Sequence, residues 1–587
     1  MMRKTAGLFL ALWALLVAGT SHAETGRILR NELPKNEREF LETGDPMTGP
    51  ERGIPEEGEG VDVETLPKFR IDRIYLKTPE DKMIVKPLVG EKKLRKILSK
   101  YEGRELNILD IRVLVKELND EYGKKGYITT RIYLEPDQNL QGGELRLTVL
   151  EGRIEDITLD NDTAKDRRKV FSAFTNEKGK IFNISHIDNG IDNLNRVESN
   201  SSKIDIIPGD RQGYSRIAIT SEKKKPIRLI LNYEDTAEEK QRYRVGIECD
   251  NLLGMNDILS LSYRGDAGKL FKESDRRNDY TESYSLSYSF PVKTWTFGIS
   301  HDSSDERSLI AGGSSGYSLR TKSRSTELST TKVLYRNADM KINLLMNLAI
   351  KDERTYIDGT RLITQDRDIT AATIGINGMF KAFGGVSSYG LTYTKGLRGF
   401  GSGRDNAYSA GTTASANVYP EDRRYQSGKW NLNLNYYKPF YFRNQGITVR
   451  TVFNGQYTND PLFSSEKFSI GNYGDIKGFP DTVSGDMGYS TKVELGYILP
   501  VDRETGWGEF VYRIRPYVEA SLGKVRDSYD MYGNRKSGIR TMSSYALGVR
   551  YYGEILTLDF GLAKPDKGRD LMKTEDSRGY VSVTATF

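Results

Sequence analysis

The sequence predicts an all-β transmembrane barrel of about 16 antiparallel strands, preceded by two small α+β domains and an N-terminal helix. Three observations support this fold class. From residue 226 to the C-terminus, apolar residues recur at every second position in many separate segments. Residues 68–225 show the same order of predicted strands and helices twice. Beyond the N-terminus, no apolar run reaches the ~18 residues that a membrane-spanning helix needs.

The first residues are typical of a secretory signal peptide. Two basic residues precede an apolar run from Ala6 to Ala18, and Ser21-His22-Ala23 has the small-x-small pattern of a cleavage site. We therefore expect residues 1–23 to be a signal peptide. Residues 24–33 then predict a short amphipathic helix, and residues 34–67, rich in Pro, Gly and Glu, predict a flexible linker.

Residues 68–152 predict the first small domain. A strand near Phe69–Leu76 is followed by a helix over Glu91–Tyr101 and by a second helix whose apolar positions end at Tyr122. A hairpin of Tyr127–Leu134 and Glu144–Leu150 completes the pattern. Taken once, this pattern would suit many small α+β domains.

Residues 153–225 repeat that pattern. A strand at Ile154–Leu159 and a helix at Ala164–Phe174 precede a second helix, which we expect Ser185 to cap. Strands at Lys203–Ile207 and Tyr214–Thr220 follow. The repetition favours two copies of one domain type.

Charged side chains occupy the alternate face of the predicted barrel strands. In the first of them, Ile227, Leu229 and Leu231 alternate with polar residues that include Arg228. Burying so many charges in the core of a soluble sandwich would cost too much free energy, whereas a water-filled lumen accommodates them. Residues 226–587 therefore predict the barrel, whose last strand ends at Phe587.

A long glycine-containing segment, Ser465–Asp481, interrupts the strand pattern. It begins with Glu-Lys-Phe-Ser-Ile-Gly, continues to Lys-Gly-Phe-Pro, and is followed by Gly485-Asp486-x-Gly488. This combination resembles the signature loop of two-partner secretion outer-membrane transporters, the TpsB family of the Omp85 superfamily. The two small domains resemble POTRA domains. By this resemblance, residues 461–485 form a re-entrant loop.

The resemblance implies an outer-membrane pore with its POTRA domains in the periplasm. It implies that sheet edges within residues 68–225 recognise an unfolded secreted exoprotein of the TpsA type, which crosses the lumen without nucleotide hydrolysis. The N-terminal helix would rest in the lumen as a plug. Phe587 resembles the signal by which the barrel assembly machinery inserts such proteins into outer-membrane lipid, and we expect a monomer.

Two other functions are compatible with a barrel. An Omp85-type assembly factor would insert outer-membrane β-barrel proteins through a seam between the first and last strands. A passive diffusion porin is a third hypothesis, but it has no use for two POTRA domains. The two POTRA domains and the predicted plug helix also weigh against the assembly factor.

The tip of the loop predicts an ion pair. In the resembled family, an arginine at the tip pairs with an aspartate on a barrel strand. Lys477, followed by Gly478 and Phe479, stands at the arginine position, and Ser521 stands at the aspartate position. Glu519 lies on the same face of that strand, about 7 Å away. We therefore predict that Glu519 is the partner of Lys477.

Several expectations accompany this predicted latch. Asp559 and Glu494 are less favoured partners of Lys477. Because a lysine cannot form the two-pronged contact of an arginine, we expect a loose pair, worth about 1 kcal/mol in a partly hydrated lumen. On the strand that carries Glu519, we expect Arg513 and Arg515 to face the lumen and Phe510 and Tyr512 to face lipid.

Composition gives no support for enzyme chemistry. Of the three histidines, His22 lies in the predicted signal peptide, while His186 and His301 stand far apart in the sequence. The single cysteine, Cys249, cannot form an internal disulfide. There is no Walker motif, and a net charge of +6 is small for 587 residues. We expect no cofactor, no metal and no nucleic-acid partner.

Overall fold

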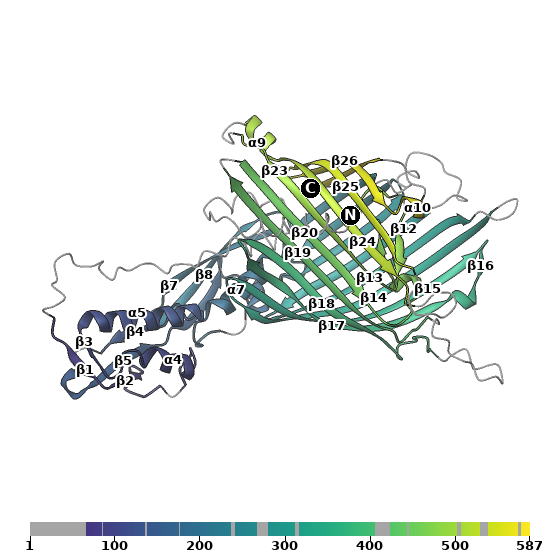
Figure 1. The fold of residues 1–587 in the computed structure, drawn as a ribbon. Coiled ribbons are helices and arrows are strands. Elements are labelled where there is room, and N and C mark those ends of the chain that lie inside the picture. Colours follow the sequence, from purple (N-terminus) through teal and green to yellow (C-terminus); the bar gives the residue numbers. More distant parts are fainter. Residues whose placement is uncertain are drawn as a thin grey trace.

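The computed structural model describes most of the chain after residue 65. The residues outside the description are 1–65, 85, 136–137, 175–176, 236–240, 267–279, 311–315, 406–422, 443–444, 480, 502–505, 529–537 and 573–576. The predicted signal peptide, N-terminal helix and residues 34–65 of the linker therefore lie outside the described residues. Two small domains extend from one end of a barrel of tilted strands (Figure 1).

The first small domain pairs two helices with a three-stranded sheet of order β2-β5-β4. An Asn107–Asp110 capping box starts the longer helix, α5. Tyr127–Thr130 lies outside the strands, so the predicted hairpin is shorter than expected. The elements are β1 Phe69–Ile71, β2 Arg73–Lys77, α4 Glu91–Leu98, β3 Arg104–Leu106, α5 Ile108–Lys124, β4 Arg131–Leu134 and β5 Glu144–Leu150.

The second small domain repeats this arrangement with a sheet of order β6-β8-β7. Its second helix is capped by Asn183, whose side chain accepts a hydrogen bond from the Ser185 backbone N–H. The predicted cap at Ser185 is wrong because the helix already begins at Ile184. The elements are β6 Arg153–Leu159, α6 Ala164–Ala173, α7 Ile184–Asn195, β7 Asn200–Pro208 and β8 Tyr214–Lys223.

Within the described residues, sixteen long antiparallel strands and the two-residue β16 form a closed barrel. The last strand pairs with the first, so the sheet has no free edge. The strands are β9 Ile227–Asp235, β10 Arg242–Asp250, β11 Ile258–Asp266, β12 Tyr280–Val292, β13 Trp295–Ile310, β14 Tyr317–Arg336, β15 Met340–Ile357, β16 Thr360–Arg361, β17 Arg367–Ala382, β18 Gly385–Leu397, β19 Gly428–Phe442, β20 Gln445–Tyr457, β23 Met487–Ile498, β24 Ile514–Arg526, β25 Arg540–Tyr552, β26 Leu556–Lys567 and β27 Arg578–Thr586.

The two faces of the barrel differ in chemistry, as the alternating pattern predicts. Apolar side chains such as Ile247 and Leu261 are exposed on the outer face. Arg228, on the inner face, forms ion pairs with Glu248 and Asp250. None of the described helices is long and apolar enough to span a bilayer.

The segment before β24 corrects one prediction. Gly506–Tyr512 is a short helix, α9, so Phe510 and Tyr512 do not belong to the lipid face of a strand. Arg513 lies at the rim, where it pairs with Glu509 one helical turn earlier and with Glu554. Arg513 therefore binds two carboxylates at the rim, one residue before β24 begins.

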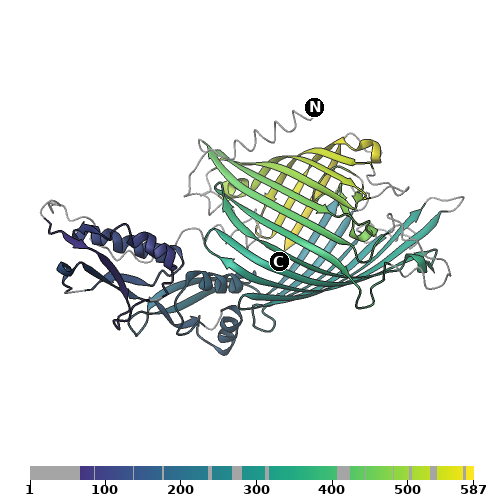
Figure 2. The same ribbon diagram turned by 60° about the horizontal axis from the view of Figure 1, so that its bottom comes forward.

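The second small domain is bonded to the barrel rim. Asp192 on α7 accepts hydrogen bonds from Arg336 at the end of β14 (3.1 Å) and from Lys341 at the start of β15 (2.8 Å). The Asn193 side chain donates to the backbone oxygen of Lys293 (2.6 Å). Only 3% of the Arg336 side chain is exposed, so these bonds lie in a packed interface. The domain and the barrel therefore form one unit, as Figure 2 shows.

Asp188, on the same helix, should make the junction between the second small domain and the barrel sensitive to pH. Burial, together with the Asp192 carboxylate, raises the pKa of Asp188 to about 6 against the opposing effect of Arg336. Because the pKa of Asp188 is higher in the folded protein than in the unfolded chain, the junction is most stable below pH about 4. It loses this stability as the pH rises through about 6. Hydrogen exchange of α7 should therefore show less protection at pH 7 than at pH 5, by about 1 kcal/mol.

Asp188→Asn should abolish this difference between pH 5 and pH 7. Asp192 does not titrate in the same window: although burial opposes it, Lys341 and Arg336 lower the pKa of Asp192. An unchanged pH dependence in Asp188→Asn would show that another group is responsible.

Candidate functional site

The segment between β20 and β23 folds back into the barrel. It contains a short turn at Ser464–Glu466 and a small hairpin of β21 (Phe468–Ile470) and β22 (Val483–Gly485), which sequence analysis treated as loop. Ile470, Ile476 and Phe479 are at most 1% exposed and pack against Val525 of β24 and Met542 of β25. Because Val518, of opposite parity on β24, is exposed on the outer face, these contacts lie on the lumen side.

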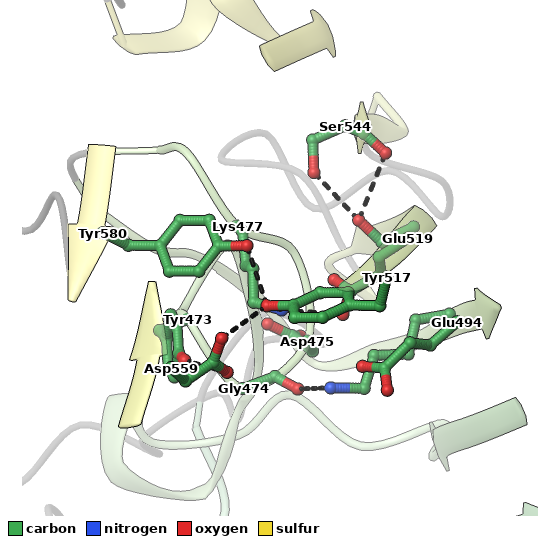
Figure 3. A network of polar contacts seen from close by, with 12 residues as sticks. Tyr473, Gly474, Asp475, Lys477, Glu494, Tyr517, Glu519, Ser544, Asp559 and Tyr580 are labelled. Atoms are coloured by element: carbon green, nitrogen blue, oxygen red, sulfur yellow. Dashed lines mark hydrogen bonds and ion pairs between the residues drawn. The ribbon is translucent and has the colours of Figure 1, made fainter. Parts of the chain in front are cut away.

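The structure brings Lys477 and Glu519 together at the tip of this loop. The Lys477 ammonium donates to the Glu519 carboxylate at 2.8 Å (Figure 3). The exposed fractions of the two side chains are 3% and 1%. The expectation of a pair in a partly hydrated setting is therefore wrong, because the loop's own packing excludes solvent from it. In the described part of the chain, the second carboxylate oxygen of Glu519 has no hydrogen-bond partner.

Three tyrosine rings surround the Lys477 ammonium. The ring centroids of Tyr473, Tyr517 and Tyr580 lie 5.2, 5.1 and 5.2 Å from its nitrogen. Tyr473 belongs to the loop, whereas Tyr517 and Tyr580 project from β24 and β27. A cation over an aromatic face is stabilised by the ring quadrupole, more strongly where water is excluded. The ammonium is therefore held by a carboxylate and an aromatic cage.

The predicted alternative partners of Lys477 serve other groups. Asp559 accepts hydrogen bonds from the Tyr473 and Tyr517 hydroxyls, both at 2.7 Å. Arg550 bridges Asp559 and Glu494, at 3.0 Å to each. These contacts extend the site into a network that connects the loop with β23, β24, β25 and β26.

Ser521 does not contact Lys477. Its hydroxyl is 2.9 Å from the hydroxyl of Ser544 on the neighbouring strand β25. Arg515, also on β24, is 5% exposed and lies on the inner face with Glu519. The position that holds an aspartate in the resembled family thus has a role in strand-to-strand contact.

Gly478 allows the loop tip to approach the wall. Its φ of 89° lies in the left-handed region, and a Cβ there would stand 3.0 Å from the Cβ of Ala563 on β26. Opposite the tip, a Cβ at Gly548 of β25 would stand 2.5 Å from the Tyr580 hydroxyl and 2.6 Å from the Tyr517 ring. The loop and the wall therefore both have a glycine beside the aromatic cage, Gly478 and Gly548, because a larger residue would clash there.

A second set of ion pairs holds the base of the loop. Glu466 pairs with Lys351 of β15 at 2.6 Å and with Lys429 of β19 at 2.8 Å. Lys467 pairs with Asp527 after β24 at 2.6 Å. The loop is therefore joined to two parts of the wall, at its base and at its tip.

Sequence reasoning missed the three cage tyrosines. Tyr517 could have been found, because it alternates with the same parity as Glu519 and so had to face the lumen. Tyr473 and Tyr580 gave no comparable signal, because the loop has no periodicity and Tyr580 lies on a strand 63 residues beyond Tyr517.

Neither a metal site nor a catalytic set emerges from this geometry. No group of three or more His, Cys, Asp or Glu residues among those described is arranged to hold a metal ion.

Phe587, the predicted insertion signal, is 57% exposed. Its backbone N–H donates to the Leu229 oxygen at 2.9 Å, which continues the seam between β27 and β9.

Comparison with protein families identifies the barrel and both small domains. The model of haemolysin secretion/activation proteins ShlB/FhaC/HecB matches residues 213–551, more than half of the chain. The chain belongs to the ShlB/FhaC/HecB family. The POTRA domain model of ShlB type matches residues 69–152, and a further POTRA model matches residues 153–208.

Individual relatives agree with this family. The chain is 28% identical over 414 residues to the outer membrane transporter CdiB of Dickeya dadantii, which covers 70% of each chain. It is 28% identical over 486 residues to the hemolysin transporter protein HpmB of Proteus mirabilis, covering 80% of this chain and 79% of the relative. The predicted relationship to two-partner secretion transporters is thereby confirmed, and with it the outer-membrane location.

Solved structures show the same fold. CdiB from Escherichia coli superposes with a TM-score of 0.77 at 22% identity, covering 95% of this chain and 96% of that one. CdiB from Acinetobacter baumannii gives 0.71 at 19% identity, covering 100% and 97%. The barrel with two POTRA domains is therefore the fold of this ShlB/FhaC/HecB family member, whose relatives are transporters.

The buried pair yields a prediction for the loop. Removing one member of a buried ion pair leaves an uncompensated charge and costs about 3 kcal/mol. In a Cys249→Ser, Ile476→Cys background, Glu519→Gln should therefore raise the rate at which a water-soluble maleimide labels the thiol at position 476 by about 100-fold.

Two further variants serve as controls for this labelling experiment. Ser521→Ala, on the same strand and face, should label like the background because Ser521 does not touch Lys477. Lys477→Met combined with Glu519→Gln should label more slowly than Glu519→Gln alone, because no charge remains unpaired. Equal rates in Glu519→Gln and the background would rule out a role of the pair in holding the loop.

Proposed function

We propose that this protein exports one TpsA-type exoprotein across the outer membrane, with the lumen latch as the barrier that must open. The observation that carries this proposal is the position of the loop: its tip is buried against the lumen wall by a single ion pair and an aromatic cage. A passing chain needs the space that the loop fills. Release of Lys477 from Glu519 therefore accompanies transport.

The POTRA domains supply the receptor for the unfolded client. An extended chain can add to the free edge of a sheet through main-chain hydrogen bonds, which tolerate many sequences. In POTRA 1, Asn119 already bonds both backbone groups of Ile132 on the edge strand β4. The opposite edge, β2, is partly used as well, because Ile74 N–H donates to Glu102 and Leu76 accepts from Ile84.

POTRA 2 offers a better edge in β7. The backbone of Ser202 faces away from β8, since it bonds the Asn195 side chain. Ile204 and Ile206 share its parity, so their N–H and C=O groups also face away from the sheet. In the described part of the chain no other backbone group bonds them. We assign the client's docking strand to β7.

The remaining features of the proposal rest on the resemblance of the chain to its family. The chain performs no catalysis and binds no nucleotide, so folding of the exoprotein outside the cell supplies direction. The N-terminal segment, which precedes the described residues, acts as a second plug that leaves the lumen before transport. The protein works as a monomer and takes no nucleic acid or cofactor.

Blocking the β7 edge tests the receptor assignment. Ile206→Pro removes one outward N–H without touching a bond to β8, and proline is tolerated on edge strands. We expect it to reduce exoprotein export at least tenfold, measured as exoprotein in the culture medium. Ile206→Ala, which loses the side-chain packing but keeps the N–H, should export normally; equal loss in both variants would point to domain instability.

Deletion of the gene separates the proposed function from the alternatives. Loss of a single exoprotein from the medium, restored by the wild-type gene, is the expected result. A general loss of outer-membrane barrels would instead support an assembly factor, and a defect confined to solute uptake would support a porin.

A further inference from the structure

A lysine lies on the lipid-facing side of the barrel. On β14, Lys332 has the parity of Leu328 and Thr330, and Leu328 is 51% exposed on the outer face. Lys332 forms no ion pair with a carboxylate in the described part of the chain, and its ammonium lies 5.0 Å from the Trp295 ring. A charge on this face is costly unless it reaches the headgroup region.

Its position along the strand places Lys332 at the periplasmic interface. β14 ends at Arg336, which bonds the POTRA 2 helix α7, so this end of the barrel is the periplasmic one. Trp295 opens β13 directly after another turn at the same end, and the two residues are register partners. Tryptophan and lysine at this depth are typical of the membrane–water interface.

An apolar groove begins next to this lysine and runs toward the membrane centre. Its volume is about 420 Å³, in the range of small-molecule sites. Phe297 stacks on Trp295 with ring centroids 6.2 Å apart and contacts Phe290 at 5.7 Å, so an aromatic surface leads from Lys332 into the groove. The groove is lined by Tyr288, Phe290, Phe297, Gly298, Ile299, Leu328, Ser329 and Thr330.

A second cation lies at the same end. Lys293 occupies the turn between β12 and β13, where its backbone bonds Ser172 of α6 and Asn193 of α7. Its ammonium is 6.0 Å from the ring of Phe171, which is 64% exposed. The neighbouring Thr294 accepts a hydrogen bond from Val333, the residue after Lys332. The two lysines therefore belong to adjacent elements of one surface.

We propose that this surface, formed by β12, β13 and β14, binds one phospholipid of the periplasmic leaflet. The phosphate lies on Lys332 with Lys293 as the second cation, and one acyl chain fills the groove. The charges are complementary, and the groove is continuous with the face that the barrel already presents to lipid. Since Lys293 is bonded to POTRA 2, the bound lipid would also brace the junction between that domain and the barrel.

Native mass spectrometry of the full-length protein in a nonionic detergent, titrated with phosphatidylglycerol, tests this site. The wild type should retain one phosphatidylglycerol at concentrations where further copies are lost. Lys332→Gln removes the cation, and Thr330→Phe fills the groove with a side chain that suits the lipid face. Each should raise the concentration for half-occupancy about fivefold or more.

Lys322→Gln is the matched control. Lys322 lies ten residues earlier on the same strand and face, 6.0 Å from the Tyr356 ring, but at the opposite end of the barrel. Its removal should leave the first phosphatidylglycerol bound as in the wild type. Unchanged binding in both Lys332→Gln and Thr330→Phe, or equal weakening in Lys322→Gln, would overturn the proposal. A heat-induced shift in electrophoretic mobility verifies that each variant barrel is folded.

Discussion

The buried pair of Lys477 and Glu519 is the interaction on which the arrangement of the lumen depends. Two charges taken out of water cost more than their attraction returns unless other polar groups compensate. Here the three tyrosine rings supply part of that compensation, and the Tyr473 and Tyr517 hydroxyls bond Asp559 in turn. The pair therefore determines the position of the loop, and the tyrosines offset part of the free-energy cost of burying the two charges.

The lysine gives this lock a different character from an arginine. An arginine would use both carboxylate oxygens, whereas the ammonium contacts one oxygen of Glu519 and the faces of three rings. Ring contacts have little directional preference compared with a two-pronged hydrogen bond. The contact is therefore shielded from water and broad in its geometry.

Sequence periodicity was sufficient for the barrel, and together with the resemblance of the loop to a family signature it predicted one residue pair. The failures of periodicity have physical causes. Alternation predicted the barrel strands because every strand has one wet and one lipid-facing side. It failed at Phe510–Tyr512, where the i,i+4 pair of Glu509 and Arg513 favours a helical turn. It also could not reveal the cage, because Tyr473 and Tyr580 meet Lys477 only once the barrel is closed.

One strand connects POTRA 2 with the loop. On β15, Lys341 bonds Asp192 of POTRA 2, and Lys351, ten residues further on the same inner face, pairs with Glu466 at the base of the loop. A strand bonded to neighbours on both sides moves as a unit, and these two lysines are about 33 Å apart along it. If a client docks on POTRA 2 as proposed, a pull on α7 would act on the same strand that holds Glu466. The loop tip, in contrast, is held by β24 and β27, on another part of the wall from β15.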